Sequence, residues 1–122
     1  MHTQTHHHWF DVEQVHDVTI VKFTCPTILN KHDVETVSQQ LLRLPAEGHH
    51  KIVLNLAAVK RMTSNMVAKL VAFQRAVQVA DGQLVLCQLQ RGILELFTIL
   101  QLLPLFRVAD TELEALESLY SA

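Results

Sequence analysis

The sequence contains few of the residues that mark disulfide-rich, fibrous or low-complexity proteins. Only three of its 122 residues are glycine and three are proline, which excludes collagen-like and linker-like chains. The two cysteines, Cys25 and Cys87, match neither a C-x-x-C motif nor a zinc-ligand spacing. We interpret them as buried, reduced thiols, and we expect the domain to fold without metal, cofactor or disulfide.

Charged residues and long apolar runs are also scarce. Charged residues make up 18% of the chain and the formal net charge is -2, whereas nucleic-acid-binding domains carry a clear basic excess. No apolar run reaches the roughly 18 residues of a membrane span. The nearest, residues 93–106, is interrupted by Glu95, Gln101 and Pro104. The N-terminus has no apolar signal-peptide core, so we expect a cytoplasmic protein that binds no nucleic acid and does not insert into a membrane.

Histidines are concentrated at the N-terminus, at positions His2, His6, His7 and His8. No cysteine or carboxylate lies among them to complete a metal site. We interpret residues 1–8 as a flexible tail, either natural or left from an expression tag. The remaining residues, 9–122, are enough for one domain and too few for two.

Apolar patterns predict strands that alternate with helices. β-branched residues at 18–23 and a nearly continuous apolar run at 51–59 are typical of strands. Pro45 and Gly48 are expected to end the first helix. The order β-β-α-β-α-β-α-β-α predicts an α/β fold, a mixed sheet of four to five strands with about four helices. The expected strands are 9–16, 18–23, 51–59, 82–89 and 106–109, and the expected helices are 32–44, 64–80, 91–103 and 111–120.

The last predicted helix carries its own start signal. Thr111 is expected to cap it, and Glu114 three residues later completes a capping box. Leu113, Leu116 and Tyr120 are predicted to form its buried face.

The usual enzyme signatures are missing from the sequence. It contains no glycine-rich phosphate-binding loop, no G-x-S-x-G nucleophile motif and no H-E-x-x-H metal motif. Catalytic residues of this architecture gather just after the strands, and the residues expected there include no base beside a nucleophile. We therefore expect no catalytic residues and no enzymatic activity.

Thr63 and Ser64 lie between a predicted buried strand and a long predicted helix. A helix N-terminus has free backbone N–H groups and a partial positive charge, so it can hold a phosphoryl group. Ser64 can therefore carry a phosphate without unfolding the domain. The alternative is that the two hydroxyl residues only cap the helix.

The segment IVLNLAAVKRMTSNMVAKL, residues 52–70, resembles the centre of STAS domains, in particular those of bacterial anti-sigma factor antagonists. In that family an apolar strand leads to Asp-Ser-Ser/Thr-Gly at the start of a helix, and residues 63–66 occupy this place. Residues 82–116 resemble the second half of the family, which has a glycine before a strand, a helix, a short strand and a closing helix. The resemblance covers nearly the full chain and implies the STAS-type fold.

The resemblance also implies a function. Anti-sigma factor antagonists bind an anti-sigma factor, a serine kinase-like ATPase, and separate from it once the kinase phosphorylates the serine of the motif. That acceptor corresponds to Ser64, and Thr63, which stands at the motif's Asp, is the competing acceptor. The helix that follows belongs to the partner-binding surface of the family. Its candidate contact residues are Asn65, Met66, Lys69, Gln74 and Arg75.

Two other roles agree with a STAS-type domain. One is a scaffold in a larger signalling assembly, which implies self-association or binding of other STAS proteins. The other is a lipid- or small-ligand-binding subunit of a transport complex, which implies a defined apolar pocket. The apolar segment 93–106 is the sequence feature that hints at a pocket, and an ordinary core helix and strand also explain it.

Overall fold

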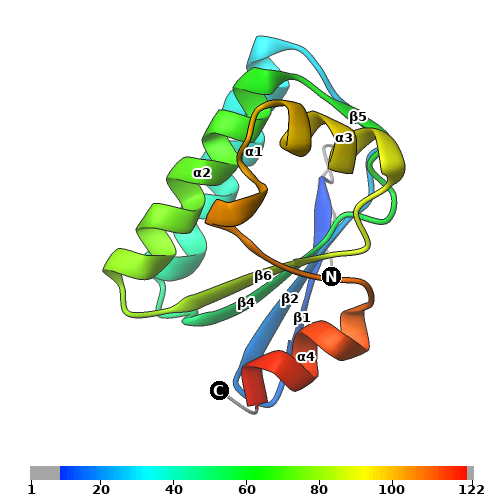
Figure 1. Ribbon diagram of the computed structural model, residues 1–122. Coiled ribbons are helices and arrows are strands. Elements are labelled where there is room, and N and C mark those ends of the chain that lie inside the picture. Colours follow the sequence, from blue (N-terminus) through cyan, green and yellow to red (C-terminus); the bar gives the residue numbers. More distant parts are fainter. Residues whose placement is uncertain (1–8, 121–122) are drawn as a thin grey trace.

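The computed structural model describes residues 9–120, and the histidine-rich tail predicted at residues 1–8 lies outside the described residues. The strands are β1 Phe10–Val15, β2 Val18–Phe23, β3 Thr27–Ile28, β4 Lys51–Asn55, β5 Arg61–Met62, β6 Gln83–Cys87 and β7 Arg107–Ala109. The helices are α1 Lys31–Ala46, α2 Ser64–Val79, α3 Arg91–Ile99, the short 3-10 helix η1 Leu103–Leu105 and α4 Glu112–Tyr120. A five-stranded sheet in the order β1-β2-β4-β6-β7 forms the centre of the fold, and β3 and β5 pair separately (Figure 1). The predicted α/β class with a mixed sheet is confirmed.

β1 and β2 form an antiparallel hairpin, as the sequence predicts. His16 and Asp17 make the turn, with His16 in the left-handed region at φ 54°. The Asp17 carboxylate lies 3.1 Å from the Lys51 ammonium. Hydrogen bonding to Lys51 lowers the pKa of Asp17, and the contact ties the hairpin turn to the start of β4.

β2, β4, β6 and β7 run parallel, and each connection between them advances in the same direction across the sheet. Crossovers between parallel strands are right-handed, so α1, α2 and α3 all lie on one face of the sheet (Figure 1). Their apolar sides and the strands enclose the larger core, which includes Phe23, Phe73 and Phe97. Because each of these helices follows a strand, all three begin at the edge where the parallel strands end, the carboxyl edge.

α4 packs on the opposite face of the sheet, over a second and smaller core (Figure 1). Ala115 and Leu119 are its buried residues, and Leu116 is partly buried. Leu113 and Tyr120, which were expected in the core, are 64% and 47% exposed. The predicted face was therefore wrong at these two positions. The helix has apolar residues on more than one side, and contact with the sheet selects its orientation.

Half of the predicted capping box is present at the start of α4. The Thr111 Oγ1 accepts a hydrogen bond from the Glu114 backbone N–H at 3.1 Å. The Glu114 carboxylate accepts instead from the backbone N–H of Asp110, at 3.2 Å. The carboxylate thus still lies at the helix start, where the helix dipole favours negative charge.

Several predicted elements end at other residues, and three of these differences are the most instructive. α1 runs two residues past its expected end and includes Pro45, which was expected to end it, and the helix stops one residue later, at Ala46. β4 ends at Asn55. The Asn55 Oδ1 accepts a hydrogen bond from the backbone N–H of Ala57 at 2.9 Å, which closes a turn after the strand. α3 ends at Ile99, and Gln101 at φ 59° leads the chain into η1.

The sequence predicts neither β3 nor β5, because a strand of two residues is too short for any periodicity. The two strands pair in parallel, Thr27 with Arg61 and Ile28 with Met62. Ile28 and Met62 are buried in the larger core. The pair joins the segments that precede α1 and α2, so it holds the starts of these two helices next to each other.

Gly82, between α2 and β6, lies where a side chain cannot fit. A Cβ at this position would lie 2.5 Å from the His50 carbonyl oxygen and 2.9 Å from a Val77 methyl group. We expect Gly82→Ala to lower the free energy of unfolding by about 2 kcal/mol, because the backbone must shift to relieve the overlap. Urea denaturation measures the change.

Gly92→Ala is the matched control for this substitution. Gly92 is exposed in α3, and a Cβ there meets nothing closer than the Lys60 carbonyl oxygen, at 3.5 Å. Alanine favours a helix over glycine by up to about 1 kcal/mol, so this variant should be at least as stable as the parent. Equal midpoints for the two variants would contradict the prediction.

Candidate functional site

Thr63 and Ser64 lie at the start of α2, and their hydroxyl groups have different environments. Thr63 is the N-cap residue, and its Oγ1 accepts a hydrogen bond from the Met66 N–H at 3.1 Å. It is half-buried, and its carbonyl oxygen accepts from the Val67 N–H, also at 3.1 Å. Ser64 is the first helical residue and is exposed, and its hydroxyl has no hydrogen-bond partner in the described chain. Ser64 therefore carries the accessible hydroxyl of the pair.

The β3–β5 pair and its flanking hydrogen bonds position this helix start. The Lys60 backbone N–H donates to the Pro26 carbonyl oxygen at 2.8 Å. The Thr63 N–H donates to the Ile28 carbonyl oxygen at 3.3 Å. The loop before α1 therefore runs alongside the segment before α2, and Leu29 in that loop is 45% exposed.

The five predicted contact residues of α2 do not share one exposed face. Asn65 and Arg75 are exposed. Met66 is fully buried in the larger core, so the folded domain does not present it to a partner, and that prediction is corrected. Ala68 and Ala72 are exposed on the same side as Asn65 and Arg75. The sequence analysis missed these two alanines, although the helical spacing could have indicated them, because Ala68 lies three residues after Asn65 and Ala72 lies three residues before Arg75.

The other two predicted contact residues are engaged within the chain, on opposite flanks of α2. The Lys69 Nζ lies 3.2 Å from the Glu35 Oε2 on α1. The Gln74 Nε2 donates to the Leu105 carbonyl oxygen in η1, at 2.6 Å. Both side chains thus connect α2 to its neighbours, and Arg75 is the cation of the predicted set that forms no such contact among the described residues.

A second polar cluster lies at the end of β4, on the face of the sheet that α4 covers. The buried Asn55 donates from Nδ2 to the Glu112 Oε2 at 2.8 Å and accepts from the Ala57 N–H at 2.9 Å. The Lys22 Nζ lies 3.9 Å from the same Glu112 oxygen. These contacts hold α4 against the carboxyl edge of the sheet. Because both polar atoms of the Asn55 side chain already form hydrogen bonds within the chain, we do not assign Asn55 a ligand-binding role.

Neither cysteine is a suitable nucleophile. Burial raises the pKa of Cys87 to about 12, with a further contribution from the charge of Glu112. Burial also raises the pKa of the half-buried Cys25 thiol. Both cysteines are free thiols, and at neutral pH both are protonated and poorly reactive. Within residues 9–120 no three His, Cys, Asp or Glu side chains are grouped as a metal site.

The apolar segment 93–106 divides between core and surface. Ile93 and Phe97 are buried, whereas Leu94 and Ile99 are 40% and 76% exposed. A hollow of about 340 Å³ lies along the outer side of α3, lined by Leu94, Ile99 and three further residues of this helix alone. It is a groove on the surface rather than a pocket between elements. None of the helices in residues 9–120 has the length and apolar character needed to cross a membrane.

Comparisons with known proteins agree with this architecture. A family model of the STAS domain matches residues 10–115. None of the curated proteins matches the sequence significantly. Among solved structures, a proposed anti-sigma factor antagonist from Thermotoga maritima is 23% identical, with a TM-score of 0.80 over 93% of this chain and 96% of its own.

Two structures of SpoIIAA also match. The anti-sigma factor antagonist SpoIIAA in its unphosphorylated form is 20% identical, with a TM-score of 0.76 over 93% of this chain and 97% of its own. The Bacillus cell fate determinant SpoIIAA in its phosphorylated form is 20% identical, with a TM-score of 0.68 over 90% and 98% of the two chains. At these identities the similarity establishes a shared fold.

The different environments of Thr63 and Ser64 can be tested through stability. We expect Thr63→Ala to lower the free energy of unfolding by about 1 kcal/mol, because it removes the oxygen that caps the Met66 N–H. Thr63→Ser keeps the oxygen and should restore most of the loss. Ser64→Ala should change stability by less than about 0.5 kcal/mol. Urea midpoints compare the variants, and a fully stable Thr63→Ala would rule out the capping role.

Proposed function

The chain belongs to the STAS domain family, and we propose that it is a regulatory binding protein that acts as an anti-sigma factor antagonist. The observation that carries the proposal is the exposed hydroxyl of Ser64 at the first position of α2, next to an uncovered helix face. Its proposed partner is an anti-sigma factor of the serine kinase-like ATPase type. The shared fold with SpoIIAA, which has a phosphorylated form, supports this proposal.

A phosphate on Ser64 is compatible with the fold. Ser64 and Asn65 carry backbone N–H groups that an α-helix leaves without an internal acceptor, and the positive end of the helix dipole lies there. A phosphate adds about -1.5 to -2 charges at neutral pH. The helix start accommodates this charge, but a partner surface that must be desolvated against it does not. Phosphorylation therefore releases a partner while the domain stays folded.

Thr63 is the less suitable acceptor of the two. Its hydroxyl oxygen already accepts the Met66 N–H, and its side chain is half-buried. A kinase would have to open the helix cap to reach it, whereas Ser64 is available in the folded protein. This difference supports Ser64, rather than Thr63, as the switch residue of the proposed mechanism.

A scaffold role is the second candidate, and the surface of α3 favours it. Leu94 and Ile99 on α3 and Leu100 after it are 40%, 76% and 37% exposed. A cluster of exposed apolar side chains is typical of a protein–protein contact. Light scattering on the purified protein separates the candidates, because a stable multimer favours the scaffold and a monomer favours the antagonist.

Incubation with an anti-sigma kinase of the source organism and ATP tests the switch. We expect mass spectrometry to find phosphate on Ser64. Ser64→Ala should fold, bind the kinase and remain unmodified. Ser64→Asp should fold and bind about a hundredfold more weakly, as expected for a desolvation penalty of a few kcal/mol.

Gln39→Glu is the control for the added charge, because Gln39 is exposed on α1 and does not belong to the outer face of α2. It should bind as the parent does. Phosphate on Thr63 alone, or on neither residue, would remove Ser64 from the mechanism and leave a constitutive binding module.

Arg75 tests whether the outer face of α2 contacts the partner. We expect Arg75→Glu to weaken binding to the anti-sigma factor while it changes stability by less than about 0.5 kcal/mol, because the side chain is exposed. Lys69→Glu is less clean, since it also breaks the ion pair with Glu35, worth up to about 1 kcal/mol. Arg43→Glu, on α1, is the control, because its i,i+4 pair with Glu47 is largely exposed and its loss costs no more than about 0.5 kcal/mol. Unchanged calorimetric affinity of Arg75→Glu would exclude this face.

A further inference from the structure

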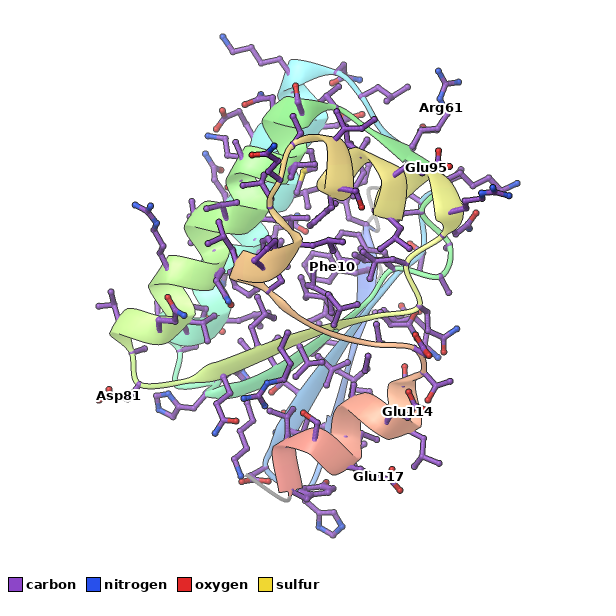
Figure 2. All side chains as sticks on the ribbon, viewed as in Figure 1. Phe10, Arg61, Asp81, Glu95, Glu114 and Glu117 are labelled. Atoms are coloured by element: carbon purple, nitrogen blue, oxygen red, sulfur yellow. The ribbon has the colours of Figure 1, made fainter. Side chains whose placement is uncertain are left out.

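Three exposed cations lie where α1 and α2 begin. Lys31 is the first residue of α1. Arg61 is the first residue of β5, Lys60 comes just before it, and α2 begins three residues after Arg61. Within the described residues none of these three side chains forms an ion pair or a hydrogen bond. Figure 2 shows the Arg61 side chain extending away from the body of the protein. The cations that do contact a carboxylate are Lys22, Arg43, Lys51, Lys69 and Arg91.

The β3–β5 pairing brings the segments that carry these cations next to an exposed apolar residue. Thr27 pairs with Arg61, so Leu29, two residues after Thr27, lies beside the segment that leads into Ser64. Leu29 is 45% exposed, and Lys31 follows it by two residues. The arrangement, an apolar centre with a polar and charged rim, is that of a protein-binding hot spot.

The surrounding backbone adds to the positive charge. α1 and α2 both begin here, and the N-terminus of a helix carries a partial positive charge. The one acidic residue in the first turn of α1 is Asp33, whose carboxylate accepts a hydrogen bond from the neutral Asn30 side chain at 2.8 Å and keeps its negative charge. The first turn of α2 contains no acidic residue. In residues 27–34 and 60–66, three cations therefore stand against one carboxylate, and the net side-chain charge of these segments is positive.

We propose that this surface, the basic edge formed by Leu29, Lys31, Lys60, Arg61 and Ser64, docks an acidic segment of a protein partner that also presents an apolar side chain to Leu29. The inference rests on the proposed function and adds the chemistry of the partner. Lys60 and Arg61 attract the acidic groups, and Leu29 supplies the contact from which water is excluded. Ser64 lies within the same surface.

The charge distribution favours a protein partner over a nucleic acid. The net charge of the chain is -2, and a phosphate backbone would require an extended basic surface. Figure 2 shows Glu114 and Glu117 on α4 well separated from Arg61, whereas Glu95 on α3, which pairs with Arg91 at 3.4 Å, lies nearer to it. The basic edge is thus a local patch bordered by an internally paired carboxylate, rather than an extended basic surface.

The sign of the charge also agrees with release by phosphorylation. A phosphate on Ser64 adds about -1.5 to -2 charges to a surface whose three unpaired cations are Lys31, Lys60 and Arg61. It therefore cancels much of the attraction for an acidic partner. The same phosphate would strengthen binding of a basic partner, which would reverse the switch.

Nuclear magnetic resonance of the isotope-labelled protein tests the proposal with a defined probe. The probe is an eight-residue peptide of alternating glutamate and leucine, and its control is the lysine–leucine peptide of equal length. We expect the acidic peptide to shift the amide signals of residues 27–31 and 60–65 and the basic peptide to leave them unchanged. Raising the salt concentration should weaken the binding.

Charge-reversal variants assign the effect to particular side chains. The double variant Lys60→Glu/Arg61→Glu should raise the Kd of the acidic peptide at least tenfold, and Ser64→Asp should raise it as well. Lys31→Glu provides an independent variant outside β5. Arg43→Glu is the matched control, because Arg43 is an exposed cation about 18 Å from Lys31 along α1. Circular dichroism confirms that each variant is folded.

Each outcome decides the proposal. Unchanged affinity in the double variant and in Lys31→Glu, or shifts confined to other residues, would overturn it. Tighter binding of a DNA duplex or of anionic vesicles at the same residues would replace the acidic protein as the occupant. If the peptide binds here but no anti-sigma factor does, the proposed function fails and this inference stands. If an anti-sigma factor binds the double variant and the parent equally, the inference fails and the proposed function stands.

Discussion

Parallel pairing of β2, β4, β6 and β7, with connections that all advance in one direction, constrains the rest of this structure. Right-handed crossovers then place α1, α2 and α3 on one face and start all three at the carboxyl edge. Ligand crevices in open α/β sheets form where the strand order reverses, and these parallel strands contain no reversal. The carboxyl edge is instead formed by helix starts and short loops.

The start of α2 connects this architecture to regulation. Core packing turns Met66 inward and leaves Asn65 and Arg75 outside. The cap engages the hydroxyl of Thr63 and leaves that of Ser64 in solvent. A charge added to Ser64 meets the positive end of a helix rather than the core. In the proposed function, folding and partner release therefore depend on neighbouring but separate groups, so phosphorylation of Ser64 would change binding without changing stability.

Local patterns predict most of the elements of this fold and the caps of α2 and α4, but not the Asn30 cap of α1. The Thr63 and Thr111 caps can be predicted from the sequence, because each threonine accepts a hydrogen bond from a backbone N–H only three residues later. The side of a helix that faces the core is harder to predict, as the exposed Leu113 and Tyr120 show. A helix with apolar residues on several sides is oriented only by the surface on which it packs. β3 and β5 escape prediction for a different reason, since two residues carry no periodicity.

The sequence by itself determined the order of the five strands of the main sheet and the four α-helices, the caps at Thr63 and Thr111 and the choice of Ser64 as the candidate hydroxyl. Each of these depends on residues a few positions apart. Only the tertiary structure decided that Met66 belongs to the core, that Lys69 pairs with Glu35, and that the segments carrying Leu29 and Arg61 meet at one edge. These features arise from strand register and helix packing between segments distant in the chain, and no local pattern specifies which distant segments will meet.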